Sequence, residues 1–365
     1  MQHLKQKYQE FDNLGALREY SPISTTTIDF TTSDYLNIAN SNNLEIAVIQ
    51  SLRKYGLGAK GSNAVCGYTQ ETKNFEIEFA KFVDYPCAIF FSSGYMANLA
   101  VYSTLFNHKS TLFADKNIHA SIIDGIQLSQ AKLKRFAHQD FSHLANIYDD
   151  KSFIISEGIF STNGAITDLS ELTKHSQNII IDEAHSFGIL GKNGRGSINH
   201  HKLNHKDIQI SIYPLGKAFG SVGAMVCTNI EIANYLRQFA RNYIYTTALP
   251  PMIISANIMQ LENLRNANSN RQKLHQNIIY FNKIANEYSL HLINDDISPI
   301  RSIVFDNNQS AIATKKKLQQ HNISVSCFRY PTVPRNKPML RFSLHSDNSF
   351  ADIKRALTFI VEKDI

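Results

Sequence analysis

The segment IIIDEAH occupies positions 179–185 and carries the strongest structural signal of the chain. Three consecutive isoleucines are typical of a strand buried on both faces, and Asp182 follows where that strand would end. A carboxylate in this place is either a hydrogen-bond or ion-pair partner within the fold or a functional group. His185 comes three residues later, so one strand end carries both an acid and an imidazole.

The segment PLGKAFG, at positions 214–220, follows a strand-like run at 208–213 and contains one lysine. Gly216, Ala218 and Gly220 surround Lys217, and their small side chains leave room for a bulky cofactor. A solvated lysine in an ordinary loop is the alternative interpretation.

Apolar runs and helical patterns alternate through much of the chain. Helical spacing of apolar residues predicts helices at 43–55, 73–83, 95–105 and 121–130. Strand-like runs occur at 87–91, 111–114, 132–137, 153–156, 179–182, 208–213 and 224–227. Apolar strands separated by helices predict an α/β fold with a mostly parallel seven-stranded sheet covered on both faces. Ligands bind such sheets at the carboxyl ends of the strands.

The pattern changes at the proline pair 250–251. A mostly helical stretch follows at 252–289, and shorter segments then predict strands at 300–305 and 339–344 and helices at 311–321 and 350–362. We therefore expect an N-terminal segment at 1–42, a large domain at 43–250 and a smaller α+β C-terminal domain at 251–365.

The amino-acid composition excludes several classes of protein. The 365 residues are 43% hydrophobic and 19% charged, which is typical of a globular protein, and the net charge is +6. Basic residues are spread along the chain, so no nucleic-acid partner is expected. The four cysteines lack CxxC or metal-ligand spacing, which predicts reduced thiols, no metal and a cytoplasmic protein. Because no signal peptide or apolar run of about 20 residues is apparent, no membrane association is expected.

Three further segments place polar groups just past predicted strands. The turn SSGYMAN at 92–98 opens a helix whose backbone N–H groups suit a phosphate, although a well-capped helix is the simpler explanation. His119 follows the run at 111–114 and Ser161 follows the run at 153–156; a single histidine in such a place is more often structural. A parallel sheet would nevertheless bring all these strand ends together.

A lysine, a carboxylate and an imidazole at neighbouring strand ends match the needs of pyridoxal 5'-phosphate. The lysine forms a Schiff base with the aldehyde, and the carboxylate keeps the pyridine nitrogen protonated so that the ring accepts electrons. A nicotinamide site is disfavoured because the chain has no GxGxxG with a trailing acid, and a serine hydrolase because it has no GxSxG.

The chain resembles the α-oxoamine synthases, pyridoxal-phosphate enzymes of aminotransferase fold type I. The resemblance runs nearly end to end and includes SSGYMAN, HASIIDG, SEGIFSTNG, IDEAHSFGILGKNGRGS, GKAFG, YIYTTALPP and FRYPTVP followed by LRFSL. The motif TTALPP at 246–251 is similar to the branch that condenses L-alanine with a pimeloyl thioester in biotin biosynthesis.

The resemblance implies roles for residues around the cofactor. Lys217 would hold the cofactor covalently and later move the Cα proton of the substrate. Asp182 would pair with the pyridine nitrogen, and His119 would stack on the ring. The phenolic oxygen side would be contacted by His185 and Ser161.

The resemblance also implies contacts farther from the ring. Gly94 and Tyr95 would help to seat the cofactor. Thr246 or Thr247 would reach the phosphate bound by a neighbouring subunit, which implies a homodimer with sites at the subunit interface. The substrate would be contacted by Arg341, which clamps the amino-acid carboxylate, and by Arg18 and Thr332.

The implied reaction is a pyridoxal-phosphate-dependent decarboxylative condensation of L-alanine with a pimeloyl thioester, carried on coenzyme A or on acyl carrier protein. Within the same family, glycine C-acetyltransferase and 5-aminolevulinate synthase are the alternatives. A non-catalytic homologue that binds pyridoxal phosphate is a further alternative, but such subunits typically lack the lysine found here at position 217.

One departure from the family pattern lies beside the lysine. The family commonly has a threonine three residues before it, in contact with the cofactor phosphate, whereas this chain has Pro214. Proline offers neither a side-chain donor nor an N–H. The lost hydrogen bond corresponds to roughly 0.5–1.5 kcal/mol, so we expect cofactor binding to be weaker by about tenfold but retained.

Overall fold

The computed structural model describes residues 1–17, 20, 27–330, 332–334 and 336–362. The described chain divides into two compact units. The larger unit comprises Leu36–Ser161 and Ile166–Arg271, and the smaller unit comprises Met1–Tyr35, Thr162–Ala165 and Gln272–Ile365. Each unit contains its own sheet.

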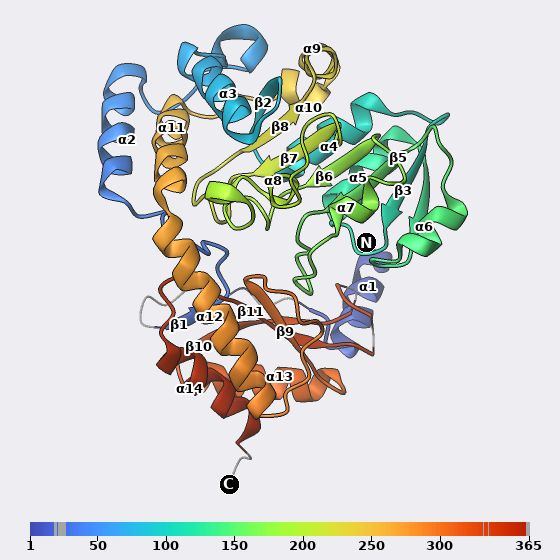
Figure 1. The fold of residues 1–365 in the computed structure, drawn as a ribbon, viewed down its shortest axis with the longest axis vertical. Helices are drawn as coiled ribbons and strands as arrows, with labels where there is room; N and C mark the ends of the chain where they lie inside the picture. The colour runs from blue at the N-terminus through green and yellow to red at the C-terminus, as the bar shows by residue number, and fades with distance from the viewer. Residues whose placement is uncertain (18–19, 21–26, 331, 335, 363–365) are drawn as a thin grey trace. The chain divides into compact units, whose positions relative to one another are not determined.

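Seven strands of the larger unit, counted over its described residues, form one sheet, which we call the large sheet (Figure 1). Their order is β2–β8–β7–β6–β5–β3–β4. Strand β8 runs antiparallel to β2 and β7, while the other neighbouring pairs are parallel, so the predicted mostly parallel sheet is confirmed. The strands are β2 (Cys87–Phe91), β3 (Thr111–Asp115), β4 (Lys132–Phe136), β5 (Phe153–Glu157), β6 (Ile179–Asp182), β7 (Ile210–Pro214) and β8 (Ala224–Thr228).

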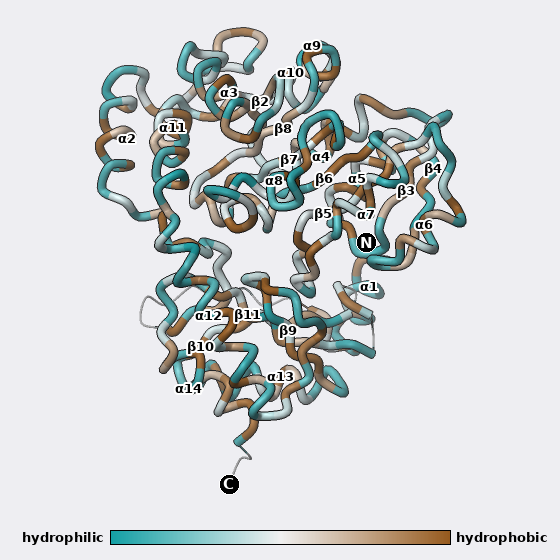
Figure 2. The backbone as a smooth tube through the Cα atoms, viewed as in Figure 1, coloured by the Kyte–Doolittle hydropathy of each residue, from teal (hydrophilic) through white to brown (hydrophobic). Residues whose placement is uncertain are grey.

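The inner strands of the large sheet form because they are buried on both faces. Ile179, Ile180 and Ile181 of β6 have no exposed surface. Successive residues of β7 point to opposite faces: Ile212 belongs to the hydrophobic cluster of helices α4 and α5, while the ring of Tyr213 lies 5.5 Å from that of Phe79 in α3. Full burial of such side chains contributes about 1.5–3 kcal/mol each. Hydrophobic residues accordingly follow these strands in Figure 2.

Helices connect and cover the strands of the large sheet. Side-chain caps start several of them; Thr69, for example, accepts from the N–H of Thr72 in a capping box, which starts α3 earlier than the apolar pattern predicts. Among the described residues, no helix is long and apolar enough to cross a membrane. The helices are α2 (Asn42–Tyr55), α3 (Gln70–Val83), α4 (Gly94–Leu105), α5 (Ala120–Ser129), α6 (Phe141–Ile147), α7 (Leu169–Leu172), α8 (Ser197–His200), α9 (Ile230–Phe239), α10 (Arg241–Ile244) and α11 (Pro251–Asn266), with short η1 (Asn63–Gly67) and η2 (Lys192–Gly194).

The division between the units differs from the one expected from the sequence. The proline pair starts a helix instead of ending a domain, because proline is favoured at the first helical position. That helix, α11, packs against α2 and α3 of the larger unit, and Figure 1 shows α2 and α11 side by side. The boundary therefore lies between Arg271 and Gln272, inside helix α12 (Asn268–Glu287), and not at residue 250.

The smaller unit, over its described residues, has a four-stranded sheet in the order β1–β10–β11–β9. Strand β1 pairs in parallel with β10, so the N-terminal segment contributes a strand to this unit instead of standing apart from it. The strands are β1 (Ile28–Phe30), β9 (Ile300–Val304), β10 (Ile323–Phe328) and β11 (Met339–Ser343), and the helices include α1 (Gln2–Asn13), α13 (Asn308–Gln320) and α14 (Phe350–Val361).

Candidate active site

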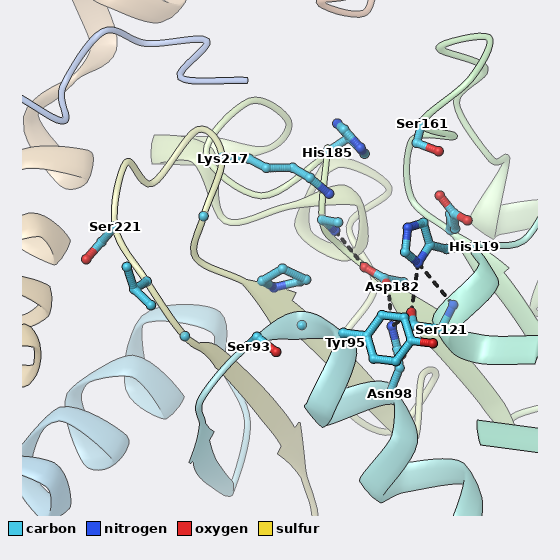
Figure 3. A pocket seen from close by; sticks show the side chains of 17 residues that line it. Ser93, Tyr95, Asn98, His119, Ser121, Ser161, Asp182, His185, Lys217 and Ser221 are labelled. Carbon is cyan, nitrogen blue, oxygen red and sulfur yellow. Dashed lines mark hydrogen bonds between the residues drawn. The ribbon is translucent and has the colours of Figure 1, made fainter. Parts of the chain in front are cut away.

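A cavity of about 380 Å³ opens in the larger unit where the strands of the large sheet end. Its lining includes residues from the loops after β2, β3, β5, β6 and β7, as Figure 3 shows. The structure thus brings together seven of the residues singled out in the sequence: Gly94, Tyr95, His119, Ser161, Asp182, His185 and Lys217.

Asp182 is the last residue of β6 and is 4% exposed. Its Oδ1 accepts from the backbone N–H of Ala184 at 2.9 Å, and its Oδ2 accepts from Nδ2 of Asn98 at 2.9 Å. Two N–H donors from different segments therefore fix the carboxylate in the cavity wall. The strand pairing places Glu157 of β5 directly opposite Asp182.

His119 stands at the N-terminus of α5, where it caps the helix. Its Nδ1 lies 2.7 Å from Oγ of Ser121 and accepts from the backbone N–H of the same residue at 3.3 Å. Burial lowers the pKa of His119, Asp182 raises it and Lys217 lowers it. Desolvation, the largest effect, favours the neutral imidazole.

Lys217 lies in the loop between β7 and β8, which is closed by backbone hydrogen bonds. The N–H of Leu215 donates to Gly223 at 2.9 Å, and the N–H of Gly220 donates to the carbonyl of Lys217 at 2.7 Å. Gly220 has a φ of +67°, and a Cβ there would lie 2.9 Å from Ala39 Cα, so this tight turn requires glycine. The Lys217 side chain points into the cavity, toward the side where Asp182 and His185 lie (Figure 3).

Two buried polar residues of the cavity were not expected from the sequence. Glu157 is 2% exposed, and its Oε1 has no hydrogen-bond partner among the described residues. Burial and the neighbouring Asp182 raise the pKa of Glu157 well above its ordinary value, which favours the neutral carboxyl. Asn98, 1% exposed, lies inside α4 and reaches Asp182. In the sequence, Glu157 resembles an ordinary strand residue and Asn98 an ordinary helix residue.

The start of α4 lines the cavity through Ser93, Gly94 and Tyr95. Oγ of Ser93 caps the helix by accepting from the N–H of Met96 at 3.2 Å, which leaves the positive end of the helix directed at the cavity. An added Cβ on Gly94 would lie 2.7 Å from Cγ of Pro214, so the close approach of α4 to Pro214 requires glycine. Pro214 itself lines the cavity and brings no hydroxyl to it.

The cavity lining fits pyridoxal phosphate by its chemistry. It presents a primary amine, a fixed carboxylate, an imidazole and a helix N-terminus, which are the groups that bind the aldehyde, the ring and the phosphate of this cofactor.

Four other described residues singled out in the sequence do not line this cavity. Thr246 and Thr247 line a second, smaller cavity of the larger unit together with Asn63. Arg341 and Thr332 belong to the smaller unit, where the Arg341 guanidinium lies 4.9 Å from the ring of Phe328. Arg18 lies outside the described residues.

Comparisons with known proteins agree with this arrangement. A family model described as aminotransferase class I and II matches residues 25–360. The 8-amino-7-oxononanoate synthase of Marinobacter nauticus is 35% identical over 337 residues, which cover 90% of this chain and 85% of the relative. The protein of the same name from Saccharophagus degradans is 36% identical over 344 residues, covering 92% and 86%.

Solved structures give the same result. The crystal structure of 8-amino-7-oxononanoate synthase from Francisella tularensis matches with a TM-score of 0.87 and 57% identity over 93% of this chain and 98% of that one. A serine palmitoyltransferase from S. paucimobilis, with a bound pyridoxal phosphate–myriocin aldimine, matches with a TM-score of 0.89 and 25% identity over 98% of this chain and 96% of that one.

The α/β sheet with Lys217, Asp182 and His119 in one cavity defines a pyridoxal-phosphate-dependent enzyme of aminotransferase fold type I. The chain belongs to the class I and II aminotransferase family and, within it, to the group of relatives named 8-amino-7-oxononanoate synthase.

Proposed function

We propose that the chain condenses L-alanine with a pimeloyl thioester, releasing carbon dioxide and the free thiol carrier and giving 8-amino-7-oxononanoate, as a step of biotin biosynthesis. One observation carries this proposal: the amine, carboxylate and imidazole expected from the sequence line one cavity, in a chain 57% identical to the Francisella synthase. The motif 246–251, TTALPP, supports the same branch of the family.

Different residues of the cavity would bind different parts of the cofactor. When bound, pyridoxal phosphate supplies an aldehyde for the amino group of the substrate and a ring that withdraws electrons from its Cα. Lys217 would bind the aldehyde, and Asp182 would hold the protonated ring nitrogen. The N-terminus of α4 would bind the phosphate, while Ser161 and His185 would contact the phenolic oxygen.

The same residues would handle the substrate. The Lys217 amine would accept the proton of the alanine Cα atom, because it is a base positioned in the cavity. His119 would help to orient the substrate. Arg341 would bind the alanine carboxylate through a two-pronged contact, with Arg18 and Thr332 as further substrate contacts.

We also propose that the active protein is a cytoplasmic homodimer. Thr246 and Thr247 lie outside the cavity of Lys217, which supports a role toward the phosphate bound by a neighbouring subunit. All four cysteines are free thiols in the structure, as a reducing compartment requires.

The proposal is tested by a product assay with purified protein, pyridoxal phosphate and L-alanine, using pimeloyl-CoA and pimeloyl-acyl carrier protein in parallel. We expect 8-amino-7-oxononanoate, identified by mass spectrometry, with at least one thioester. Lys217→Ala should form none, and the exposed Lys206→Ala should behave like the parent.

Several results would contradict the proposal. Product formation by Lys217→Ala at the parental rate would rule out the role of this lysine. A clear preference for glycine over alanine would instead favour glycine C-acetyltransferase or 5-aminolevulinate synthase. Absence of any cofactor absorption band after addition of pyridoxal phosphate would indicate a non-catalytic homologue.

A further inference from the structure

Four side chains of the larger unit form a continuous chain of hydrogen bonds from Asp182 to His119 (Figure 3). Nδ2 of Asn98 lies 2.9 Å from Oδ2 of Asp182 and 2.9 Å from Oγ of Ser121. The Ser121 hydroxyl in turn lies 2.7 Å from Nδ1 of His119. Asn98 and Ser121 are each 1% exposed, so no bulk water competes for these bonds.

The direction of each hydrogen bond follows from the charge on Asp182. An ionised carboxylate only accepts, so Asn98 must turn its NH₂ group and not its carbonyl oxygen toward Asp182. The second hydrogen of that NH₂ group then donates to Oγ of Ser121. The hydrogen of the Ser121 hydroxyl can then donate to Nδ1 of His119, the next atom in the chain, when that nitrogen carries no proton.

A second donor reaches the same nitrogen. The backbone N–H of Ser121 donates to Nδ1 of His119 at 3.3 Å, and this donor cannot rotate away. A proton on Nδ1 would face this N–H directly, donor against donor. The proton of the neutral imidazole is therefore placed on Nε2.

We propose that Asn98 and Ser121 are positioning residues that tie the tautomer of His119 to the charge on Asp182, so that His119 presents Nε2–H as a donor. The tautomer depends on this hydrogen-bond chain and on the backbone N–H of Ser121, and not on the proposed function. Its catalytic use rests on the proposed function: both substrates carry oxygen acceptors, a carboxylate on alanine and a carbonyl on the thioester, to which an N–H donates.

The charges around His119 agree with a neutral ring. Desolvation lowers its pKa, while the carboxylates of Asp182 and Asp124 raise it and the Lys217 ammonium lowers it. The pKa of the neighbouring Glu157 is raised well above its ordinary value, chiefly by burial. Loss of the donors to Nδ1 would destabilise the neutral ring relative to the imidazolium.

The test is nitrogen NMR of the purified protein labelled with ¹⁵N-histidine, with the His119 signals assigned by their loss in His119→Asn. We expect the Nε2–H tautomer in the parent. Ser121→Ala and Asn98→Ala should each shift the tautomer ratio by roughly two- to tenfold toward Nδ1–H, because one neutral hydrogen bond is lost. A titration of the same signals should show a raised His119 pKa in both variants.

Ser129→Ala is the matched control, since Ser129 is a buried serine of the same helix α5 whose hydroxyl donates to Ile126 at 2.6 Å. It should leave the His119 signals unchanged. Ser121→Ala removes a single oxygen and keeps the inference testable if Asn98→Ala fails to fold. An Nδ1–H tautomer in the parent, or His119 signals that Ser121→Ala leaves unaltered, would overturn the proposal. Neither readout depends on turnover, so a failed product assay would be distinguishable from a failed tautomer assignment.

Discussion

Pro214 is the residue at which this site departs most clearly from the pattern of the α-oxoamine synthases. It ends β7, pairs with Ala224 of β8 and lines the cavity beside Gly94. Its position in the wall supports the expectation that a threonine here would reach the cofactor phosphate.

Pro214→Thr should therefore raise the affinity for pyridoxal phosphate by up to about tenfold, because it restores one hydrogen bond worth roughly 0.5–1.5 kcal/mol. The dissociation constant is measured by titrating cofactor-free protein and following absorbance. Pro214→Val has the shape of threonine without the hydroxyl and should not tighten binding. Equal affinities of the threonine and valine variants would show that no phosphate contact is gained.

The protonation of Glu157 leads to a second prediction about a single residue, which concerns the dependence of stability on pH. Burial raises the pKa of Glu157 well above its ordinary value, so the folded chain keeps a proton that the unfolded chain releases above about pH 4.3. The unfolded state then binds fewer protons, and stability falls as pH rises, by at most about 1.4 kcal/mol per pH unit.

Glu157→Gln removes this penalty and leaves a neutral side chain of similar size. Its melting temperature should exceed that of the parent at pH 7.5, and the gap should close toward pH 4. The exposed Glu231→Gln serves as control and should show no such dependence. A Glu157→Gln variant that is less stable than the parent at every pH would refute a neutral Glu157.

At the scale of elements, the start of α4 packs closely against the end of β7 in the wall of the cavity. A Cβ on Gly94 would lie 2.7 Å from Cγ and 2.8 Å from Cβ of Pro214, closer than such atoms pack. Gly94→Ala should cost about 1–3 kcal/mol of stability through overpacking and weaken cofactor binding. Pro214→Gly removes both of these atoms, so Gly94→Ala should cost much less stability in the Pro214→Gly background than in the parent when thermal unfolding is compared; purely additive effects would show that the two residues do not conflict.

The elements that the sequence predicts best are those with strong hydrophobic patterns. All seven strands of the large sheet were predicted near their observed positions, because continuous apolar runs such as 179–181 require burial on both faces. Strands β1 and β10 were missed. β1 has three residues, too few for a periodic pattern, and both depend on pairing with segments far away in sequence.

The cavity was predictable where chemistry-bearing residues follow strands, as Lys217, Asp182 and His119 do. Asn98 and Glu157 were missed because a polar residue inside a helix or at a strand end carries no signal of its own. Their importance appears only when the sheet register sets Glu157 beside Asp182 and α4 brings Asn98 to the same carboxylate.

At the scale of the whole molecule, the proposed dimer predicts that two inactive variants restore product formation when they are mixed, which monomers could not do. If Thr246 and Thr247 serve the site of the partner, a hybrid dimer of Lys217→Ala and the double variant Thr246→Ala, Thr247→Ala contains one intact site and one doubly altered site.

Mixing the two variants under conditions that exchange subunits should restore product formation to about one quarter of the parental rate, since half of the dimers are hybrids with one working site each. Each variant alone, assayed at low cofactor concentration, should be nearly inactive. A mixture no more active than its parts would place all cofactor contacts within one chain.

The central claim, that the cavity around Lys217 holds the cofactor, is tested most directly by reducing the cofactor-loaded protein with sodium borohydride and mapping its peptides by mass spectrometry. We expect one phosphopyridoxyl group, attached to the peptide that contains Lys217. Attachment to a different lysine, or an unmodified Lys217 peptide from fully loaded protein, would contradict it.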